Sequence, residues 1–407
     1  MRTILHCDLN NFYASVECLY HPEIRGKPVA VCGDPELRHG IVLAKNNQAK
    51  ARGVKTGDAI WQAKQKCPGL VCVPPHYSRY LQYSRQAREI YGEYTDRVEA
   101  FGLDECWLDL TGCEHLVGEG EAVADELRRR IREELGVTAS VGVSFCKVFA
   151  KLGSDMKKPD ATTVIPKERY REIVWPLPVG DLLYVGRATE RRLERYGIRT
   201  IGQLAQVDYD FITERLGKMG AVVWGWANGY DSAPVRAIGQ EEAIKSIGNS
   251  TTAPRDLACE EEVRITLWAL CESVAYRLRQ HRLLCGTVQV SMRMNDLLSF
   301  ERQVKLAEPT CLAEEIMETA MGLYRRNKPR EPLRSIGVRG CQLTPLACQQ
   351  MSLFDRQPQR LRLERTVDGL RERFGNKSVQ RGLMLTDRAL SAVDPADHVI
   401  HPVGYFR

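Results

Sequence analysis

Three carboxylates have the residue types and spacing that could do chemistry. Asp8 lies near the end of an apolar stretch, and Asp104 and Glu105 stand side by side in FGLDECWLDL, residues 101–110. Neighbouring carboxylates repel one another, and burial of either one is costly unless a cation compensates. Hard divalent cations bind such oxygen ligands, and two of them roughly 3.5–4 Å apart would clamp a phosphoryl transfer. Taken alone, the pair also fits a solvated turn, and Asp8 also fits a helix cap.

The elements that would position these carboxylates alternate between strand and helix. An apolar strand is expected at 2–9, and 98–110 is expected to form two strands or one bent hairpin. The other expected strands are 28–33, 41–45, 138–144 and 161–165, and the expected helices are 46–53, 59–67, 78–97, 120–135 and 147–158. If one sheet holds the first strand beside the hairpin, all three carboxylates come together.

The C-terminal part has a different pattern. Residues 175–232 are rich in helices, and 233–247 form a looser linker. In 248–345, two helical stretches accompany the strictly alternating strand GTVQVSMRM and a second strand, LRSIGVRGCQL. This pattern predicts a small α+β domain with one exposed sheet face. A further amphipathic helix is expected near 360–373.

Composition narrows the class of protein. The chain has 407 residues, of which 43% are apolar and 27% charged, as in soluble globular proteins with several domains. No apolar run approaches the roughly 18 residues of a membrane span, so a cytoplasmic location is the default expectation. None of the 14 cysteines forms a C-x-x-C pair, which disfavours a structural zinc or a disulfide framework. The net charge of +6 permits a polyanionic partner without requiring one.

Three segments resemble the motifs of a known family. The segments ILHCDLNNFYASVE, FGLDECWLDLTG and ASVGVSFCKVFAKLGSDMKKPD are similar to the first, second and third motifs of the Y-family DNA polymerases, the translesion enzymes. The resemblance runs in the family's order from residue 1 to about 345, and the bacterial DNA polymerase IV type is the most similar branch.

The resemblance implies an α+β, multidomain right-hand polymerase. Its parts would be a ferredoxin-like palm (1–10 and 77–166), small fingers (11–76), a helical thumb with a helix-hairpin-helix (167–232), a linker (233–247), an α+β little finger (248–345) and a tail with a sliding-clamp-binding motif (346–407).

The resemblance also assigns roles in the active site. Asp8, Asp104 and Glu105 would be catalytic and would bind two Mg²⁺ ions together with the backbone carbonyl of Leu9. Tyr13 aligns with the steric gate, an aromatic ring that leaves no room for a 2′-hydroxyl and so selects deoxyribonucleotides. The other implied nucleotide-binding residues are Phe12 behind the gate, Lys158, Asn47 and Lys50 at the phosphates, and Leu43 and Gly57 in a roof over the nascent base pair.

Three positions near the active site depart from the family's pattern. Asn47 and Lys50 stand where a tyrosine and an arginine commonly bind the phosphates. A lysine neutralises phosphate as a point charge and lacks the bidentate fork of arginine. Asn10 stands where a second carboxylate sometimes occurs in the first motif.

The implied DNA contacts lie in the thumb and the little finger. VGRATERRLERYGI resembles the helix-hairpin-helix, whose backbone N–H groups approach DNA phosphates, and it implies contacts at Gly186 and Arg187. Tyr184 stands where a glycine is common in that turn. In the little finger, whose sheet lies across the major groove in this family, the candidate phosphate contacts are Arg293, Arg334 and Arg339. Each of these arginines also fits an ordinary solvated residue.

A short segment in the tail resembles a clamp-binding peptide. QQMSLFD, residues 349–355, is similar to the pentamer Q-L-x-L-F that binds the sliding clamp, the β subunit. Gln350, Met351, Leu353 and Phe354 would fill a hydrophobic pocket of the clamp as an extended peptide. The alternative is a segment that packs back on its own domain.

The expected activity is template-directed DNA synthesis with low fidelity and lesion bypass, performed by a monomer. The primer 3′-hydroxyl would attack the α-phosphate of a dNTP with two Mg²⁺ ions in place. One rival is a palm-type nucleotidyl cyclase, which the thumb-like hairpin and the clamp-like tail disfavour. Another is a catalytically inactive Y-family scaffold, which the intact carboxylates disfavour.

Overall fold

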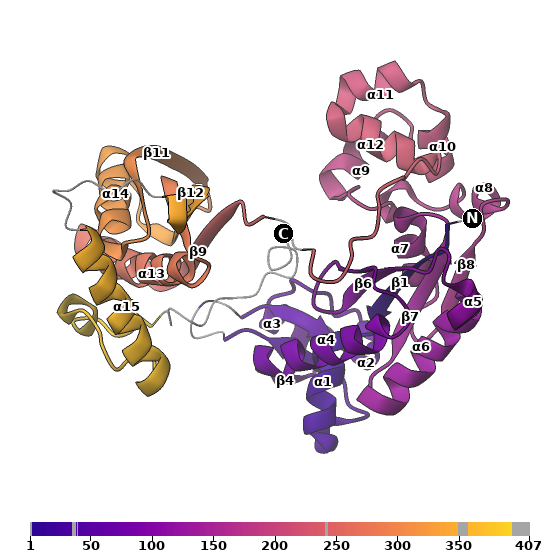
Figure 1. The fold of residues 1–407 in the computed structure, drawn as a ribbon, viewed down its shortest axis with the longest axis horizontal. Helices are drawn as coiled ribbons and strands as arrows, with labels where there is room; N and C mark the ends of the chain where they lie inside the picture. Colours follow the sequence, from indigo (N-terminus) through magenta and orange to yellow (C-terminus); the bar gives the residue numbers. More distant parts are fainter. Residues whose placement is uncertain (1, 35–37, 39, 241–242, 349–356, 393–407) are drawn as a thin grey trace. The chain divides into compact units, whose positions relative to one another are not determined.

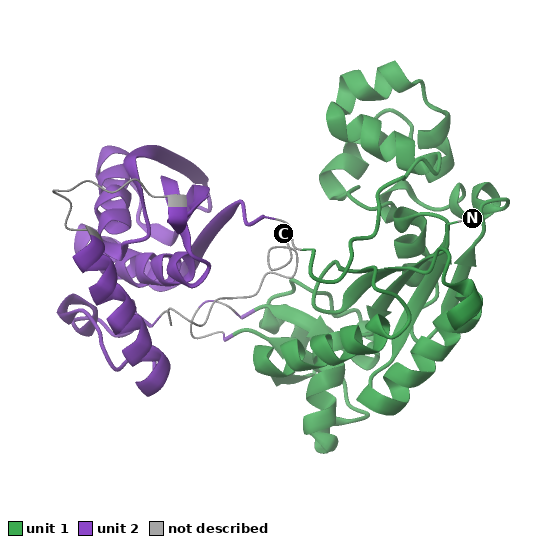
Figure 2. Ribbon diagram, in the orientation of Figure 1, with its two compact units in different colours: residues 1–33, 41–241, 402–406 green, residues 34–40, 242–401, 407 purple. Residues whose placement is uncertain are grey.

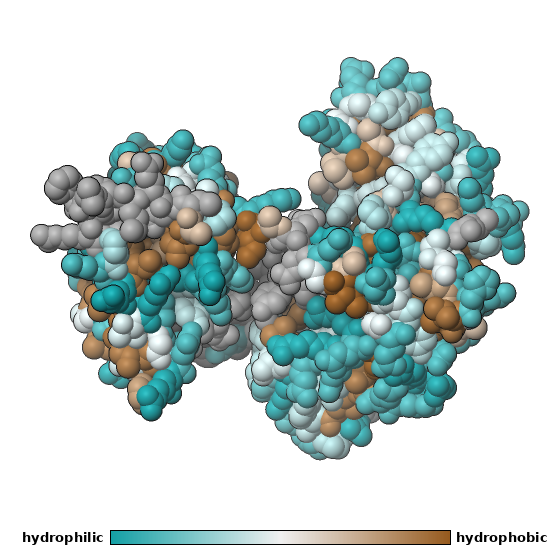
Figure 3. All heavy atoms as spheres, in the orientation of Figure 1, coloured by the Kyte–Doolittle hydropathy of each residue, from teal (hydrophilic) through white to brown (hydrophobic). Residues whose placement is uncertain are grey.

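The structure is a computed structural model that describes the chain except residues 1, 35–37, 39, 241–242, 349–356 and 393–407. The described residues form two compact units, one containing 1–33 and 41–241 and the other 34–40 and 242–401 (Figure 2). Hydrophilic residues cover much of the visible surface of each unit (Figure 3). None of the described helices combines the length and the apolar character needed to cross a membrane.

The first unit is built on a five-stranded sheet (Figure 1). Its strands are β1 (Ile4–Leu9), β5 (Val98–Ala100), β6 (Glu105–Asp109), β7 (Ala139–Ser144) and β8 (Thr162–Ile165), in the order β5-β6-β1-β7-β8. The chain forms α4 (Tyr77–Gly92) between β1 and β5, and α5 (Glu114–Val117) and α6 (Gly120–Leu135) between β6 and β7. With β1 antiparallel to both β6 and β7, the first four strands have the order of a ferredoxin-like fold.

Alternate residues of β1 face opposite sides of this sheet. Cys7 interacts with Tyr91 of α4, whereas His6 places its Nδ1 2.9 Å from Ser154 Oγ of α7 (Lys147–Met156). Helix α7 approaches the sheet closely because Gly142 of β7 has no side chain, and a Cβ there would collide with the α7 backbone. Asp8, two residues after His6, therefore lies on the α7 side of the sheet.

The residues predicted as fingers form a small three-stranded sheet. Its strands have the order β3-β2-β4, with β2 at Val29–Cys32, β3 at Val42–Lys45 and β4 at Val71–Val73. The accompanying helices are α1 (Phe12–Tyr20), α2 (Asn47–Ala51) and α3 (Ile60–Lys66). The sequence-based prediction lacks β4, because three residues are too few to show a period.

Helices make up most of residues 167–232. They are α8 (Tyr170–Val174), α9 (Arg187–Glu194), α10 (Ile201–Gln206), α11 (Tyr209–Leu216) and α12 (Lys218–Ala227). Their apolar residues share a core with Phe149 and Leu152 of α7, and the rings of Phe149 and Tyr170 stack at 5.4 Å. Helix α7 therefore packs both on the sheet and on this helical region.

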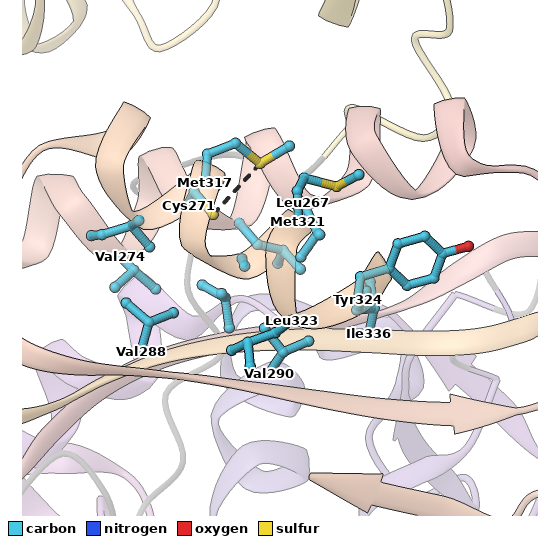
Figure 4. Packing of buried hydrophobic residues seen from close by; sticks show 14 of the residues in the cluster. Leu267, Cys271, Val274, Val288, Val290, Met317, Met321, Leu323, Tyr324 and Ile336 are labelled. Carbon is cyan, nitrogen blue, oxygen red and sulfur yellow. Dashed lines mark hydrogen bonds between the residues drawn. The ribbon is translucent and has the colours of Figure 1, made fainter. Parts of the chain in front are cut away.

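The second unit contains a four-stranded antiparallel sheet, β11-β10-β12-β9. Its elements are β9 (Ser246–Leu257), α13 (Glu260–Gln280), β10 (Leu283–Met294), β11 (Ser299–Thr310), α14 (Ala313–Arg326) and β12 (Leu333–Pro345). Apolar side chains of both helices pack against β10, including Val274 and Leu323 near Val288 and Val290 (Figure 4). The sequence-based prediction missed β9 and β11. Both are edge strands that contain a proline, and the partly buried apolar side of β11 (Phe300, Val304 and Leu306) is interrupted by the charged Arg302, so the alternation is weak in the sequence.

The helix expected near 360–373 is α15 (Gln357–Phe374), and it packs on α13 of the second unit. The guanidinium of Arg279, which is 4% exposed, donates to both carboxylate oxygens of Asp368 at 2.6 and 2.7 Å. Arg371 pairs with the buried Glu272 at 2.8 Å. These buried ion pairs, of which the Arg279–Asp368 pair is bidentate, satisfy charges that would otherwise be costly to bury, so α15 is an integral part of the unit.

Candidate active site

The pairing of β1 with β6 brings the predicted carboxylates together. Asp8 lies directly opposite Glu105 in the antiparallel register, so both side chains are on the α7 side of the sheet. The backbone N–H of Leu9 donates to the carbonyl of Asp104 at 3.0 Å, which fixes Asp104 next to the end of β1. The juxtaposition expected from the order of strands is therefore present.

The electrostatics of these carboxylates show mutual repulsion in a buried site. Burial, followed by the charges of Asp8 and Glu105, raises the pKa of Asp104 to about 7. Burial also raises the pKa of Asp8, although the Lys158 ammonium opposes it. Burial alone would raise the pKa of Glu105, but the adjacent His6 ring and the Lys151 ammonium outweigh it and lower the pKa to about 2. Such a site attracts positive charge.

Two lysines of the third motif supply positive charge in this conformation. Lys158 Nζ lies 2.6 Å from Asp8 Oδ2 and 2.9 Å from Asp155 Oδ1. Lys151 Nζ lies 3.1 Å from Glu105 Oε2, 3.4 Å from Asp8 Oδ2 and 3.1 Å from Asp155 Oδ2. Lys158, predicted to contact phosphate, thus lies within the carboxylate site.

The donor atoms of the predicted site determine whether it fits a cation. Glu105 Oε2 and His6 Nε2 are buried 3.4 Å apart, and neither makes a hydrogen bond of good geometry in the described part of the chain. Across the same residues, no three His, Cys, Asp or Glu side chains converge as a ready-made metal cluster. A set of carboxylate oxygens that is otherwise compensated by ion pairs with Lys151 and Lys158 suits a hard cation that completes its shell with other ligands.

Asn10 is a structural residue of this site. Its Oδ1 accepts a hydrogen bond from the N–H of Asp160 at 2.8 Å, and its Nδ2 donates to Ser140 Oγ at 3.0 Å. Asn10 therefore links β7 to the turn that carries Lys158. The amide has this role at the position where the family sometimes has a carboxylate.

Tyr13 belongs to an aromatic stack beside the carboxylates. Its ring lies parallel to that of Tyr80, with centroids 4.2 Å apart and an interplanar angle of 7°. Phe12 is buried and packs at a tilt against both rings. Burial, with a smaller contribution from the Asp104 charge, raises the pKa of Tyr13 above its ordinary value. The predicted gate and the predicted metal ligands are therefore near one another.

The two residues of the predicted fingers that are expected to bind phosphate, Asn47 and Lys50, both lie on the short helix α2. The Oδ1 of Asn47 accepts a hydrogen bond from Asn11 Nδ2 at 3.0 Å, which ties α2 to the turn between Asp8 and Tyr13. Lys50 is exposed on the same helix, and burial together with the Lys50 charge lowers the pKa of Lys45. Two amines therefore lie near each other here, of which the sequence-based prediction named one.

The predicted roof residues lie together in the fingers sheet. Leu43 is half-buried on the edge strand β3. The N–H of Gly57, whose φ of +87° favours glycine, donates to the carbonyl of Val42 at 2.8 Å. Gly57 is therefore adjacent to the strand position of Leu43.

In the helical region, Gly186 is the residue before α9 and Arg187 is its first residue, and both are exposed. Tyr184 has a left-handed φ of +65°, and its half-exposed ring packs on Trp226 at 5.4 Å. The backbone conformation that glycine usually supplies is thus kept, with an aromatic ring in its place.

In the second unit, the sheet face opposite α13 and α14 is polar. Arg339 faces Gln289, and Arg293 faces Ser335, on strands whose other side is buried. Arg334 lies apart from this row, where the register of β12 shifts, and its charge contributes to the lowered pKa of Asp256. The predicted clamp-binding residues Gln350, Met351, Leu353 and Phe354 lie outside the described residues.

Sequence reasoning missed several residues of the site. His6 could have been found because it is two residues before Asp8 and shares its side of the strand. Lys151 and Asp155 were missed, although they recur at helical spacing with the predicted Lys158, which places all three on one side of α7 and the turn after it. This spacing can be read from the sequence, but the sequence does not show which strand α7 packs on.

A ferredoxin-like sheet that presents adjacent carboxylates next to an aromatic stack, joined to a small fingers sheet and a helical region, defines the class of right-hand nucleic-acid polymerases. The comparisons specify the family. The model of the impB/mucB/samB family matches residues 7–155, and the model of that family's C-terminal domain matches residues 244–353.

Relatives in other bacteria match nearly the whole chain. DNA polymerase IV of Acetivibrio thermocellus is 53% identical over 96% of this chain and 100% of that protein. DNA polymerase IV of Moorella thermoacetica is 38% identical over 94% of this chain and 96% of that protein. A solved Y-family DNA polymerase chimera of Dbh and Dpo4 has the same fold, with a TM-score of 0.74 at 24% identity over 84% of this chain and 99% of that chain.

The chain therefore belongs to the impB/mucB/samB family, the Y-family DNA polymerases, and is of the DNA polymerase IV type. It is a DNA-directed DNA polymerase of translesion synthesis that acts on primer-template DNA and dNTPs and requires divalent metal ions. The resemblance inferred from the three sequence motifs is confirmed, and the cyclase alternative is wrong.

Proposed function

We propose that Asp8, Asp104 and Glu105 bind two Mg²⁺ ions, with the carbonyl of Leu9 as a further ligand, and that this is the site of nucleotidyl transfer. The observation that carries the proposal is the register that sets Asp8 opposite Glu105 with Asp104 next to it. When bound, the two ions activate the primer 3′-hydroxyl and stabilise charge on the phosphates. The protein's own contribution is to hold the carboxylates on a rigid sheet before the substrates arrive.

Lys151 and Lys158 are proposed to balance charge at this site. Without a substrate they neutralise the carboxylates, and Asp155 holds both ammonium groups on one side. With a triphosphate bound, Lys158 would donate to its oxygens, assisted by Asn47, Lys50 and Lys45 from the fingers. Leu43 and Gly57 would cover the base pair, and Phe12 would support the gate residue Tyr13.

The proposed DNA contacts are to the phosphate backbone and are therefore largely independent of the base sequence. Gly186 and Arg187 would approach a phosphate at the start of α9. Arg293 and Arg339 lie on the polar sheet face of the second unit, where a phosphate could be contacted without reading a base. Arg334 would contact a phosphate only from the edge of this face.

The dependence of primer extension on Mg²⁺ tests the number of ions. We expect the initial rate to rise with more than the first power of Mg²⁺ concentration, because both ions must be present for transfer. Chelation by EDTA should stop synthesis, while binding of primer-template DNA, measured by fluorescence anisotropy, persists. A simple hyperbolic dependence on Mg²⁺ would contradict the two-ion proposal, and synthesis in EDTA would contradict the metal site altogether.

We also propose that Gln350, Met351, Leu353 and Phe354 bind the sliding clamp and that the enzyme acts as a monomer. Phe354→Ala should weaken clamp binding by about tenfold or more, because a buried aromatic anchor carries much of the energy of such a peptide. Clamp-stimulated synthesis should fall, and synthesis without the clamp should stay the same.

Phe374→Ala is the matched control for the clamp experiment. Phe374 is 63% exposed near the end of α15, in the same tail but outside the motif. Equal loss of clamp stimulation in both variants would argue against a specific role of the motif.

A further inference from the structure

A completely buried carboxylate lies outside the metal site. Glu17 is on α1 and is 0% exposed. A buried carboxylate is costly unless several donors satisfy it. Glu17 accepts from three side chains of one short segment: Tyr80 Oη at 2.5 Å, Arg79 Nη1 at 3.0 Å and the ring of His76 at 3.0 Å. Glu17 thus fastens the first turn of α4 to α1.

The hydroxyl of Tyr80 is held from two sides. It donates to Glu17 and accepts from the backbone N–H of His76 at 3.1 Å. The ring of Tyr80 is itself 0% exposed, so these two bonds and the surrounding rings determine its position. Hydrogen bonds to a charged acceptor are short and directional, which makes this arrangement stiff.

Tyr80 is the surface on which Tyr13 lies. The two rings are stacked at 4.2 Å and 7°, and Tyr77 contacts each of them edge-on. Tyr13 and Glu17 are four residues apart on α1 and therefore lie on the same side of the helix. Tyr80 therefore contacts α1 twice, through its hydrogen bond to Glu17 and through its stack with Tyr13. These two contacts leave the Tyr13 ring little freedom to move.

We propose that Glu17 is a positioning residue for sugar discrimination: it fixes Tyr80, and Tyr80 fixes the distance at which the Tyr13 ring meets C2′ of the incoming nucleotide. This inference rests on the proposed gate role of Tyr13. The side chain of Glu17 makes its hydrogen bonds to α4 and not to the proposed metal ligands, so we expect its effect on selectivity. A shift of the ring by a fraction of an ångström would admit a 2′-hydroxyl, whereas a deoxyribonucleotide would still fit.

Single-nucleotide incorporation of dCTP and CTP opposite guanine tests the inference. For Glu17→Gln, the ratio of kcat/KM for dCTP to that for CTP should fall by about tenfold, as expected for a small misplacement of a positioned group. The change should appear mainly as a gain in CTP use, with kcat/KM for dCTP altered by less than about threefold. Tyr80→Phe, which keeps the ring and removes the hydroxyl, should give the same shift, and the double variant should add nothing further.

Glu99→Gln is the matched control, because Glu99 is also a buried carboxylate with cationic partners, Lys147 at 2.7 Å and Arg236 at 3.0 Å, but it lies away from the aromatic stack. Its discrimination ratio should equal that of the wild type. An unchanged ratio in Tyr80→Phe overturns the inference even if Glu17→Gln fails to fold. If Tyr13→Ala incorporates CTP but Glu17→Gln and Tyr80→Phe do not, only the inference on Glu17 is contradicted. If Tyr13→Ala leaves the discrimination ratio unchanged, the proposed gate role of Tyr13 is contradicted.

Discussion

Asp104→Ala is expected to lower the rate of primer extension by at least about a thousandfold, because loss of a proposed metal-binding carboxylate would remove several kcal/mol of transition-state stabilisation. The side chain lies next to the Asp8 and Glu105 pair, and its burial, together with the charges of both neighbours, raises its pKa to about 7. The measurement is single-turnover extension of a DNA primer with Mg²⁺ and dNTPs. Undiminished extension by this variant would contradict the assignment of the active site.

The same variant is expected to keep its fold. A folded-state pKa of about 7, above the ordinary 3.8, means that ionised Asp104 destabilises the metal-free protein as the pH rises through this range. Removal of the carboxylate should therefore leave the unfolding temperature at pH 8 unchanged or higher. A lower temperature would show that the loss of activity reflects unfolding.

Asp109→Asn tests whether the effect of Asp104→Ala is specific to the proposed metal ligands, because Asp109 belongs to the same sequence motif but is not one of these ligands. Asp109 lies on β6 four residues after Glu105, and its Oδ1 accepts from the N–H of Thr111 at 2.9 Å. An amide oxygen can keep that bond, so extension should stay within about threefold of the wild type, as for a conservative change outside the reacting groups. A loss as large as that of Asp104→Ala would assign Asp109 to the catalytic machinery.

The sequence was most informative where a short motif and a strand coincide. Asp8 and Glu105 could be predicted to meet, because β1 is strongly apolar and a hairpin containing Glu105 has few places to pair in a small sheet. The identity of the partners across the sheet could not be predicted. Lys151 contacts Glu105 only because Gly142 allows α7 to lie close on β7, and periodicity gives the side of a helix but not what that side covers.

The burial of charged residues between α13 and α15 could not be predicted from the sequence either. Arg279, Asp368, Arg371 and Glu272 are charged residues whose types suggest a solvated surface, yet they form buried pairs between α13 and α15. Side-chain burial between two helices far apart in the sequence depends on tertiary docking, which local pattern does not encode. The edge strands β9 and β11 escaped prediction for a related reason, since each contains a proline and few of its side chains are fully buried, so its pattern in the sequence is weak.

Tyr13→Ala is expected to reduce discrimination against ribonucleotides by about a hundredfold, because rejection of an added hydroxyl at a close-fitting surface depends on the clash alone. The ring of Tyr13 is half-buried against Tyr80, so only its remaining side can meet a sugar, and truncation to a methyl group removes that contact. Incorporation of dCTP and CTP opposite guanine gives the ratio directly. Tyr13→Phe keeps the ring and the stack, so it should retain discrimination; if it loses as much as Tyr13→Ala, the hydroxyl and not the bulk of the ring performs the selection. Tyr80 lies parallel to Tyr13, so if Tyr13 is the gate, we expect the gate to act as a stack of two rings, in which Tyr13 meets the nucleotide and Tyr80 holds Tyr13 in place.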